Sequence, residues 1–96
     1  IPNKVYEALA MGKPVVTADT PAVRELLSGG ENVFLCRKAD SKSLAEKILF
    51  VRNHQDTAIK IAQNGHRLFE TRLKEEVLAA ELLKYINETK RKTLRD

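Results

Sequence analysis

The first apolar stripe of the chain predicts a short helix. Val5, Ala8 and Leu9 recur at helical spacing within residues 3–11, so one side of this segment is suited to packing against a sheet. Pro2 fits near the start of such a helix, where its missing amide proton costs nothing. We therefore expect the chain to open on a helix of about two turns.

The next apolar segments predict two short strands joined by a helix. Gly12 can end the first helix in the left-handed conformation, and residues 14–17 are apolar on both faces, as in a parallel strand covered by helices. Thr20 can cap a helix over residues 21–28, and residues 33–36 read as the second strand. The order strand, helix, strand is typical of the crossover between parallel strands in α/β proteins.

A third helix is predicted after the second strand, with two alternatives for its first turn. Asp40 or Ser41 can cap it, but Ser43 with Glu46 also matches a capping box. The apolar residues that follow fall at helical spacing: Leu44, Ile48 and Val51.

Two more helices are predicted in the second half of the chain. The fourth begins at about Asp56, and Gly65 inside it costs about 1 kcal/mol relative to Ala, which indicates close packing against a neighbour. The last begins near residue 73 or 74, and residues 88–96 are expected to form a frayed basic tail. The apolar residues of these two helices are Ile59, Ala62, Leu68, Phe69, Val77, Leu78, Leu82, Tyr85 and Ile86.

The length of the chain limits its organisation. Ninety-six residues fit at most one small domain, and two strands are fewer than the roughly five or six of a doubly wound sheet. We therefore predict an α/β fold with two short parallel strands and about five helices, forming part of a larger domain in a longer protein.

The charge of the chain is concentrated at its end. The net charge is +4, and the excess lies in the last stretch, at Lys84, Lys90, Arg91, Lys92 and Arg95. A solvated helix end is the simplest interpretation, because cations suit the negative end of a helix. Anionic lipid or nucleic acid is the alternative partner. The absence of Trp, and of aromatic residues interleaved with basic ones, argues against nucleic acid.

Cysteine and histidine indicate no metal or nucleophilic site. Cys36 is the single cysteine and is predicted to be a buried strand residue, while His54 and His66 are predicted to be surface residues. The apolar runs are far shorter than the roughly 20 residues needed to span a bilayer. We expect a cytoplasmic location, with peripheral association of the parent protein at a membrane surface as the alternative.

Glu7 is the most informative polar residue of the chain. A carboxylate near the start of a helix either complements the helix dipole or binds a ligand, since carboxylates accept hydrogen bonds from vicinal hydroxyls, as they do from ribose in dinucleotide-binding folds. Asp19 and Thr20 follow the first strand, where ligands bind in open α/β sheets, although turn and cap chemistry also explains them. The residues alone do not decide between dipole and ligand for Glu7, or between ligand and turn or cap for Asp19 and Thr20.

The run from Glu7 to Val16 carries a family resemblance. Glu-Ala-Leu-Ala-x-Gly-x-Pro-Val-Val resembles the second half of the signature of glycosyltransferase family 4, the glycosyl transferases group 1. These enzymes have the two-domain GT-B fold and use nucleotide sugars. Their signature has two glutamates separated by seven residues; Glu7 matches the second, and the first would lie two positions before Ile1.

The resemblance implies a set of binding residues. Glu7 would accept hydrogen bonds from the ribose of the donor, and the backbone amides of Asn3 and Lys4 would meet its diphosphate. Free amide protons and the helix dipole suit that role. Asp19 and Thr20 would line the same cleft. The resemblance implies no catalytic residue among these 96, no metal and no cofactor besides the donor substrate.

Two functions are therefore considered from the sequence. The first is that residues 1–96 form the C-terminal part of the Rossmann-like, donor-binding domain of a retaining glycosyltransferase, inactive by itself. The parent would transfer a sugar from a nucleotide diphosphate sugar to a glycan or lipid-linked acceptor held by an N-terminal domain. The alternative is a non-catalytic Rossmann-like interaction module with a basic C-terminal helix.

Overall fold

The computed structural model describes residues 1 and 3–95, with the side chains of residues 1 and 3–91. The predicted place of Pro2 near the helix start therefore lies outside the described residues, as do the side chains of the basic residues Lys92 and Arg95.

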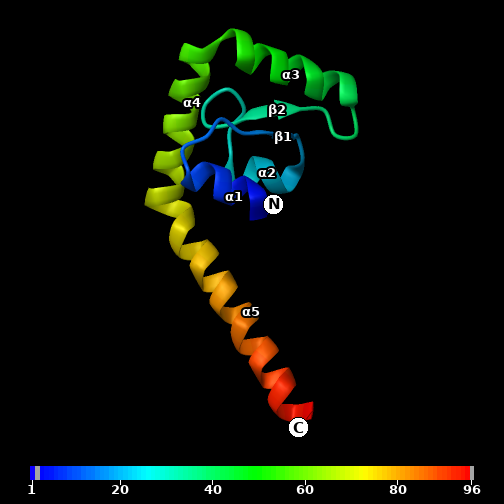
Figure 1. The fold of residues 1–96 in the computed structure, drawn as a ribbon, viewed down its shortest axis with the longest axis vertical. Helices are drawn as coiled ribbons and strands as arrows, with labels where there is room; N and C mark the ends of the chain where they lie inside the picture. Colours follow the sequence, from blue (N-terminus) through cyan, green and yellow to red (C-terminus); the bar gives the residue numbers. More distant parts are fainter. Residues whose placement is uncertain (2, 96) are drawn as a thin grey trace.

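The fold is α/β, as predicted, with a two-stranded parallel sheet at its centre. β1 (Val16–Ala18) pairs with β2 (Phe34–Cys36), and the helix α2 (Pro21–Leu26) joins them. Figure 1 shows α1 (Asn3–Ala10) and α2 on one side of the strands and α3 (Ser41–Asn53) on the other. The arrangement is consistent with a fragment of a Rossmann-like domain.

α1 forms and ends as its sequence predicts. Val5 and Leu9 are buried on its inner side. Gly12 adopts a φ of +69°, and the amide of Lys13 donates to Ala8 O while the amide of Gly12 donates to Leu9 O. These two bonds form a Schellman motif, which satisfies carbonyls that a helix end leaves without partners.

Both strands begin later than predicted. The ladder opens where the Phe34 amide donates to Val15 O at 2.8 Å, and it closes where the Asp19 amide donates to Cys36 O at 2.8 Å. Pro14, predicted as the first strand residue, has no amide proton to give to a sheet. Cys36 is buried in β2, as predicted.

The helix caps distinguish the alternatives that the sequence left open. Thr20 caps α2, with Pro21 as its first residue, as predicted. Asp40 caps α3, because its carboxylate accepts from the Ser43 amide at 3.0 Å. Ser43 is not the cap; its buried hydroxyl accepts from the Arg37 amide at 2.9 Å.

The last two helices are continuous rather than separate. α4 (Gln55–Leu68) passes through a π-helical turn, η1 (Phe69–Leu73), into α5 (Lys74–Arg95). At this turn the Thr71 hydroxyl donates to Arg67 O at 2.7 Å, so this backbone carbonyl accepts from a side-chain donor. α5 extends past residue 88, where the sequence analysis ended it, and projects from the body of the fold (Figure 1).

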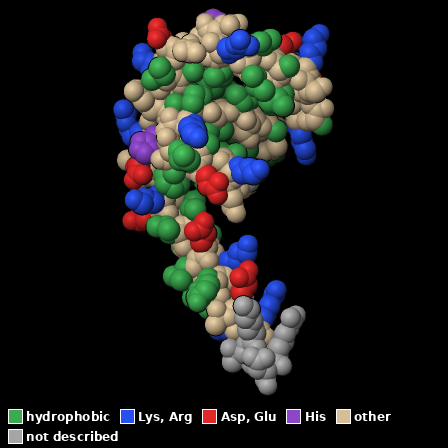
Figure 2. Space-filling view, viewed as in Figure 1, with side chains coloured by type: hydrophobic (Ala, Val, Ile, Leu, Met, Phe, Trp, Pro, Cys, Tyr) green, Lys and Arg blue, Asp and Glu red, His purple; other side chains and the backbone are tan. Residues whose placement is uncertain are grey.

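The core lies between α1, α2, the strands and the α4–η1 segment. Leu9, Leu27 and Val33 are its largest fully buried side chains, and Leu73 of η1 joins the same cluster. Several apolar residues of the later helices are instead largely exposed, and Figure 2 shows hydrophobic side chains at the surface along α5. These residues are Leu44, Ile48, Ile59, Leu78, Leu82, Tyr85 and Ile86.

The buried face of α4 matches the expected one at Ala62 and differs from it at Ile59. Ile59 is 54% exposed, whereas Ala58, Ile61, Ala62 and Gly65 are buried. Small residues at this face let the helix approach its neighbours closely.

Among the described residues, no helix combines the length and hydropathy needed to cross a membrane.

Candidate functional site

The three residues with the strongest predicted role lie together on the outer side of α1. Asn3, Lys4 and Glu7 are all exposed, opposite the buried Val5 and Leu9. Asn3 and Lys4 form the first turn, so their amide protons have no acceptor within the helix. Glu7 lies three and four residues further on, which places its carboxylate one turn above them on the same side.

The carboxylate of Glu7 is free within the described residues. It makes no hydrogen bond and no ion pair there, and its side chain borders an open groove of about 220 Å³ between α1 and the η1–α5 segment. Lys74 and Glu81 of α5 line the opposite side of this groove. Sequence reasoning missed these two residues, because nothing in their spacing shows that they face a helix some seventy positions earlier.

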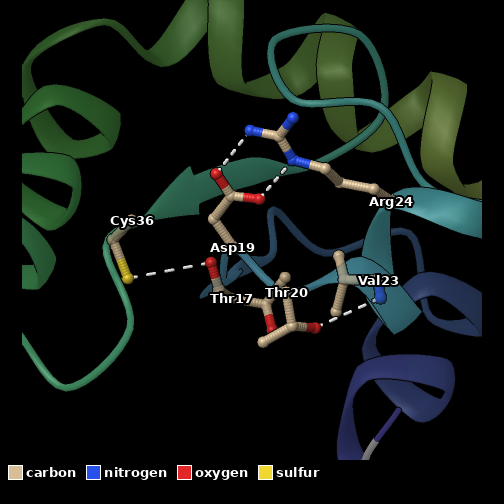
Figure 3. Close-up of polar contacts among 6 residues, drawn as sticks. All are labelled: Thr17, Asp19, Thr20, Val23, Arg24 and Cys36. Atoms are coloured by element: carbon tan, nitrogen blue, oxygen red, sulfur yellow. Dashed lines mark hydrogen bonds and ion pairs between the residues drawn. The ribbon is translucent and has the colours of Figure 1, made fainter.

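Asp19 is engaged by a neighbouring side chain. Both of its carboxylate oxygens accept from Arg24, one from Nε at 2.5 Å and the other from a terminal guanidinium nitrogen at 2.6 Å (Figure 3). The hydrogen bond from Arg24 lowers the pKa of Asp19 from its usual value of 3.8, and the positive charge of Arg24 adds to this effect. The Asp19 carboxylate is therefore ionised and paired.

Thr20 is engaged as well, by the backbone of the helix that it caps. Its hydroxyl oxygen accepts from the Val23 amide at 3.2 Å (Figure 3). The turn-and-cap interpretation of Asp19 and Thr20 thus has direct geometric support, while Glu7 has no such local use.

The fold brings the two groups of predicted residues to one side of the sheet. Figure 1 shows α1 and α2 both beginning on the side at which the parallel strands end. The free amides of α1 and the Asp19–Thr20 turn therefore share the carboxyl edge of the sheet, where open α/β folds bind ligands.

Three consecutive residues of α4 that the sequence did not assign to the site contact α1 and the loop before β2. Nδ1 of His66 lies 3.3 Å from Leu9 O, and the Asn64 side chain donates to Glu31 O at 2.9 Å. Between them, Gly65 approaches α1 so closely that a β-carbon would lie 2.8 Å from Leu9 Cδ2. His66 is half-buried, so the prediction of a surface histidine was wrong for this residue. In the sequence, only Gly65 indicated that this part of α4 packs closely against a neighbour.

Comparisons with known proteins agree with the resemblance in the signature segment. Residues 1–54, more than half of the chain, match the family model of the glycosyl transferases group 1. The chain is also 30% identical over 80 residues to the capsular polysaccharide biosynthesis glycosyltransferase CapM of Staphylococcus aureus. That alignment covers 83% of the chain and 21% of the relative, so the chain spans about a fifth of the relative's length. The chain belongs to the glycosyl transferases group 1 family.

Proposed function

We propose that the parent protein is a retaining glycosyltransferase of the GT-B fold, and that these residues bind the ribose and the diphosphate of its nucleotide-sugar donor. Family membership supports sugar transfer as the activity. The observation that carries the finer assignment is the free, exposed carboxylate of Glu7 one turn above the free amides of Asn3 and Lys4.

The chemistry of α1 fits the two parts of such a donor. Amide protons at the start of a helix donate to phosphate oxygens, and the positive end of the helix dipole favours their negative charge. The ammonium group of Lys4 adds to this charge. A carboxylate one turn further along accepts hydrogen bonds from both hydroxyls of a ribose. These contacts need no metal and no cofactor beyond the donor itself.

Asp19 and Thr20 have a supporting role in this proposal. Because their side chains are paired with Arg24 and with the Val23 amide, they hold the turn at the carboxyl edge of the sheet. The acceptor, a glycan or a lipid-linked saccharide, would bind elsewhere in the parent protein. We propose that the parent acts in the cytoplasm, either free or at the membrane surface.

The test is the loss of the Glu7 charge in the complete parent protein. Glu7→Gln keeps the size of the side chain but weakens its hydrogen bonds to hydroxyls, so we expect donor affinity to fall by about tenfold or more. Calorimetry against a panel of UDP-, GDP- and ADP-sugars measures this loss and identifies the base. Glu46→Gln, at an exposed glutamate of α3, is the matched control and should bind like the wild type.

A second set of variants distinguishes the donor-binding function from the alternative, a non-catalytic interaction module that binds a partner through its basic C-terminal helix. Replacing Lys90, Arg91 and Lys92 by Gln should leave donor affinity and turnover unchanged if α1 carries the function. If these replacements abolished function while Glu7→Gln changed neither affinity nor turnover, the interaction-module alternative would stand and the donor-site assignment would fall.

A further inference from the structure

The position of α1 decides where its functional groups lie. The helix has eight residues, and isolated helices of that length are marginal in water, so tertiary contacts must hold it in place. Glu7 is two residues before Leu9 on this rigid unit. A contact that holds Leu9 therefore also sets the height and rotation of the Glu7 carboxylate.

His66 makes a polar contact with α1 at its carboxyl end. Leu9 O already accepts from the Gly12 amide at 3.1 Å, and Nδ1 of His66 approaches the same oxygen at 3.3 Å from another helix. A carbonyl oxygen only accepts, so Nδ1 must carry the hydrogen in this contact. A donor here also complements the negative end of the α1 dipole.

Two neighbours of His66 fix the position of α4 and therefore the position of the His66 ring. The absence of a side chain at Gly65 brings the backbone of α4 against Leu9 and against Asn32 O. The Asn64 side chain ties the same turn of α4 to Glu31 O, in the loop before β2. α4 is thus held against the body of the fold, and the His66 ring has a defined place from which to reach α1.

We propose that His66 is a positioning residue for the donor site: by donating from Nδ1 to Leu9 O, it holds α1 so that Glu7 meets the ribose. This inference rests on the proposed function. It predicts that His66 affects donor binding only through the placement of α1, since its ring contacts the carboxyl end of this helix rather than the exposed face that carries Glu7.

The experiment compares replacements of His66 in the complete parent protein. In His66→Ala the donor KM should rise by about fivefold, the effect of one hydrogen bond, while kcat at saturating donor stays unchanged. His66→Asn should restore the KM, because its amide nitrogen is as many bonds from Cα as Nδ1. His66→Gln, whose amide lies one bond further out, should not. His54→Ala removes a histidine between α3 and α4 whose Nδ1 contacts Phe50 O of α3, and it should behave like the wild type.

A double-mutant cycle tests the route of the effect. If His66 acts by placing α1, His66→Ala should raise the KM of Glu7→Gln by less than it raises the KM of the wild type. A misplaced carboxylate and an uncharged side chain lose the same interaction, so only the contacts of the Asn3 and Lys4 amides remain to be disturbed. Additive effects, or equal KM values for the asparagine and glutamine variants, would overturn the proposal. If the alanine variant did not fold, the asparagine and glutamine variants would make the same comparison. A Glu7→Gln protein with wild-type donor affinity would refute the proposed function itself, which is a different result.

Discussion

Gly65 of α4 lies directly against Leu9 of α1: a β-carbon at position 65 would lie 2.8 Å from Leu9 Cδ2. The same β-carbon would lie 2.8 Å from Asn32 O, so the position is restricted on two sides. The backbone oxygen cannot move out of the way as a flexible side chain can. The absence of a side chain at Gly65 therefore lets α4 lie this close to the helix that carries Glu7.

Gly65→Ala should destabilise the protein despite the better helix propensity of alanine. The propensity gain is about 1 kcal/mol, and the overpacking cost is about 1–3 kcal/mol, so we expect the free energy of unfolding to fall. Urea denaturation measures the difference. Gln63→Ala, at an exposed neighbour in α4, is the control and should change stability little. A Gly65→Ala protein more stable than the wild type would contradict the packing.

Gly12→Ala should also destabilise the protein, but for a conformational reason alone. Gly12 has a φ of +69°, and nothing lies within 4 Å of a β-carbon built there, so no clash contributes. The left-handed conformation costs a residue with a β-carbon about 1 kcal/mol. Gly12→Asn should lose less, because Asn tolerates this conformation. Equal losses of melting temperature in the two variants would argue against this explanation.

Thr20→Val should lower the free energy of unfolding by about 1 kcal/mol, because α2 loses its cap while the shape of the side chain is kept. Thr20→Ser retains a hydroxyl oxygen for the Val23 amide and should keep most of the stability. Thr57→Val, at an exposed threonine of α4, is the control for the change of side chain. Thermal denaturation of the three variants checks the prediction. An unchanged Thr20→Val protein would show that the cap contributes nothing.

The Asp19–Arg24 pair should make stability depend on pH in the acid range. The pKa of Asp19 is lowered from 3.8 in the folded protein, so the folded state favours the ionised carboxylate. Its contribution is fully present above the unfolded-state pKa and is lost as the pH falls through the lower folded-state pKa. Melting temperatures of the wild type and Asp19→Asn should therefore converge below about pH 3.8. High salt should reduce the difference at neutral pH, because the pair is exposed.

Asp40 should also make the protein less stable as the pH falls, over the same acid range as Asp19. Its pKa is lowered chiefly by the hydrogen bond from the Ser43 backbone and then by the one from Arg37. The acid sensitivity that remains in Asp19→Asn should therefore decrease further when Asp40 is also replaced by Asn. The contrary outcome is that the melting temperatures of the wild type, the single variant and the double variant fall in parallel below pH 3.8. In that case these two carboxylates would not be the source of the acid sensitivity.

The candidate site was predictable as far as it depends on neighbouring residues. Glu7 and the amides of Asn3 and Lys4 fall on one short helix, and their common side follows from helical spacing. The groove beside Glu7 was not predictable, since its other wall is Lys74 and Glu81 of α5. Sequence spacing carries no information about which distant helix passes by.

The sequence by itself determined the local features: the end of α1 at Gly12, the cap at Thr20, and the parallel order of β1 and β2. Each of these depends on backbone conformations and hydrogen bonds within a few residues, or on the length of the connection. Only the tertiary structure decided that α4 buries Ala58 and Ile61, that Ile59 faces outward and that His66 reaches Leu9. Burial and long-range contact depend on the shape of the partner surface, which no single segment encodes.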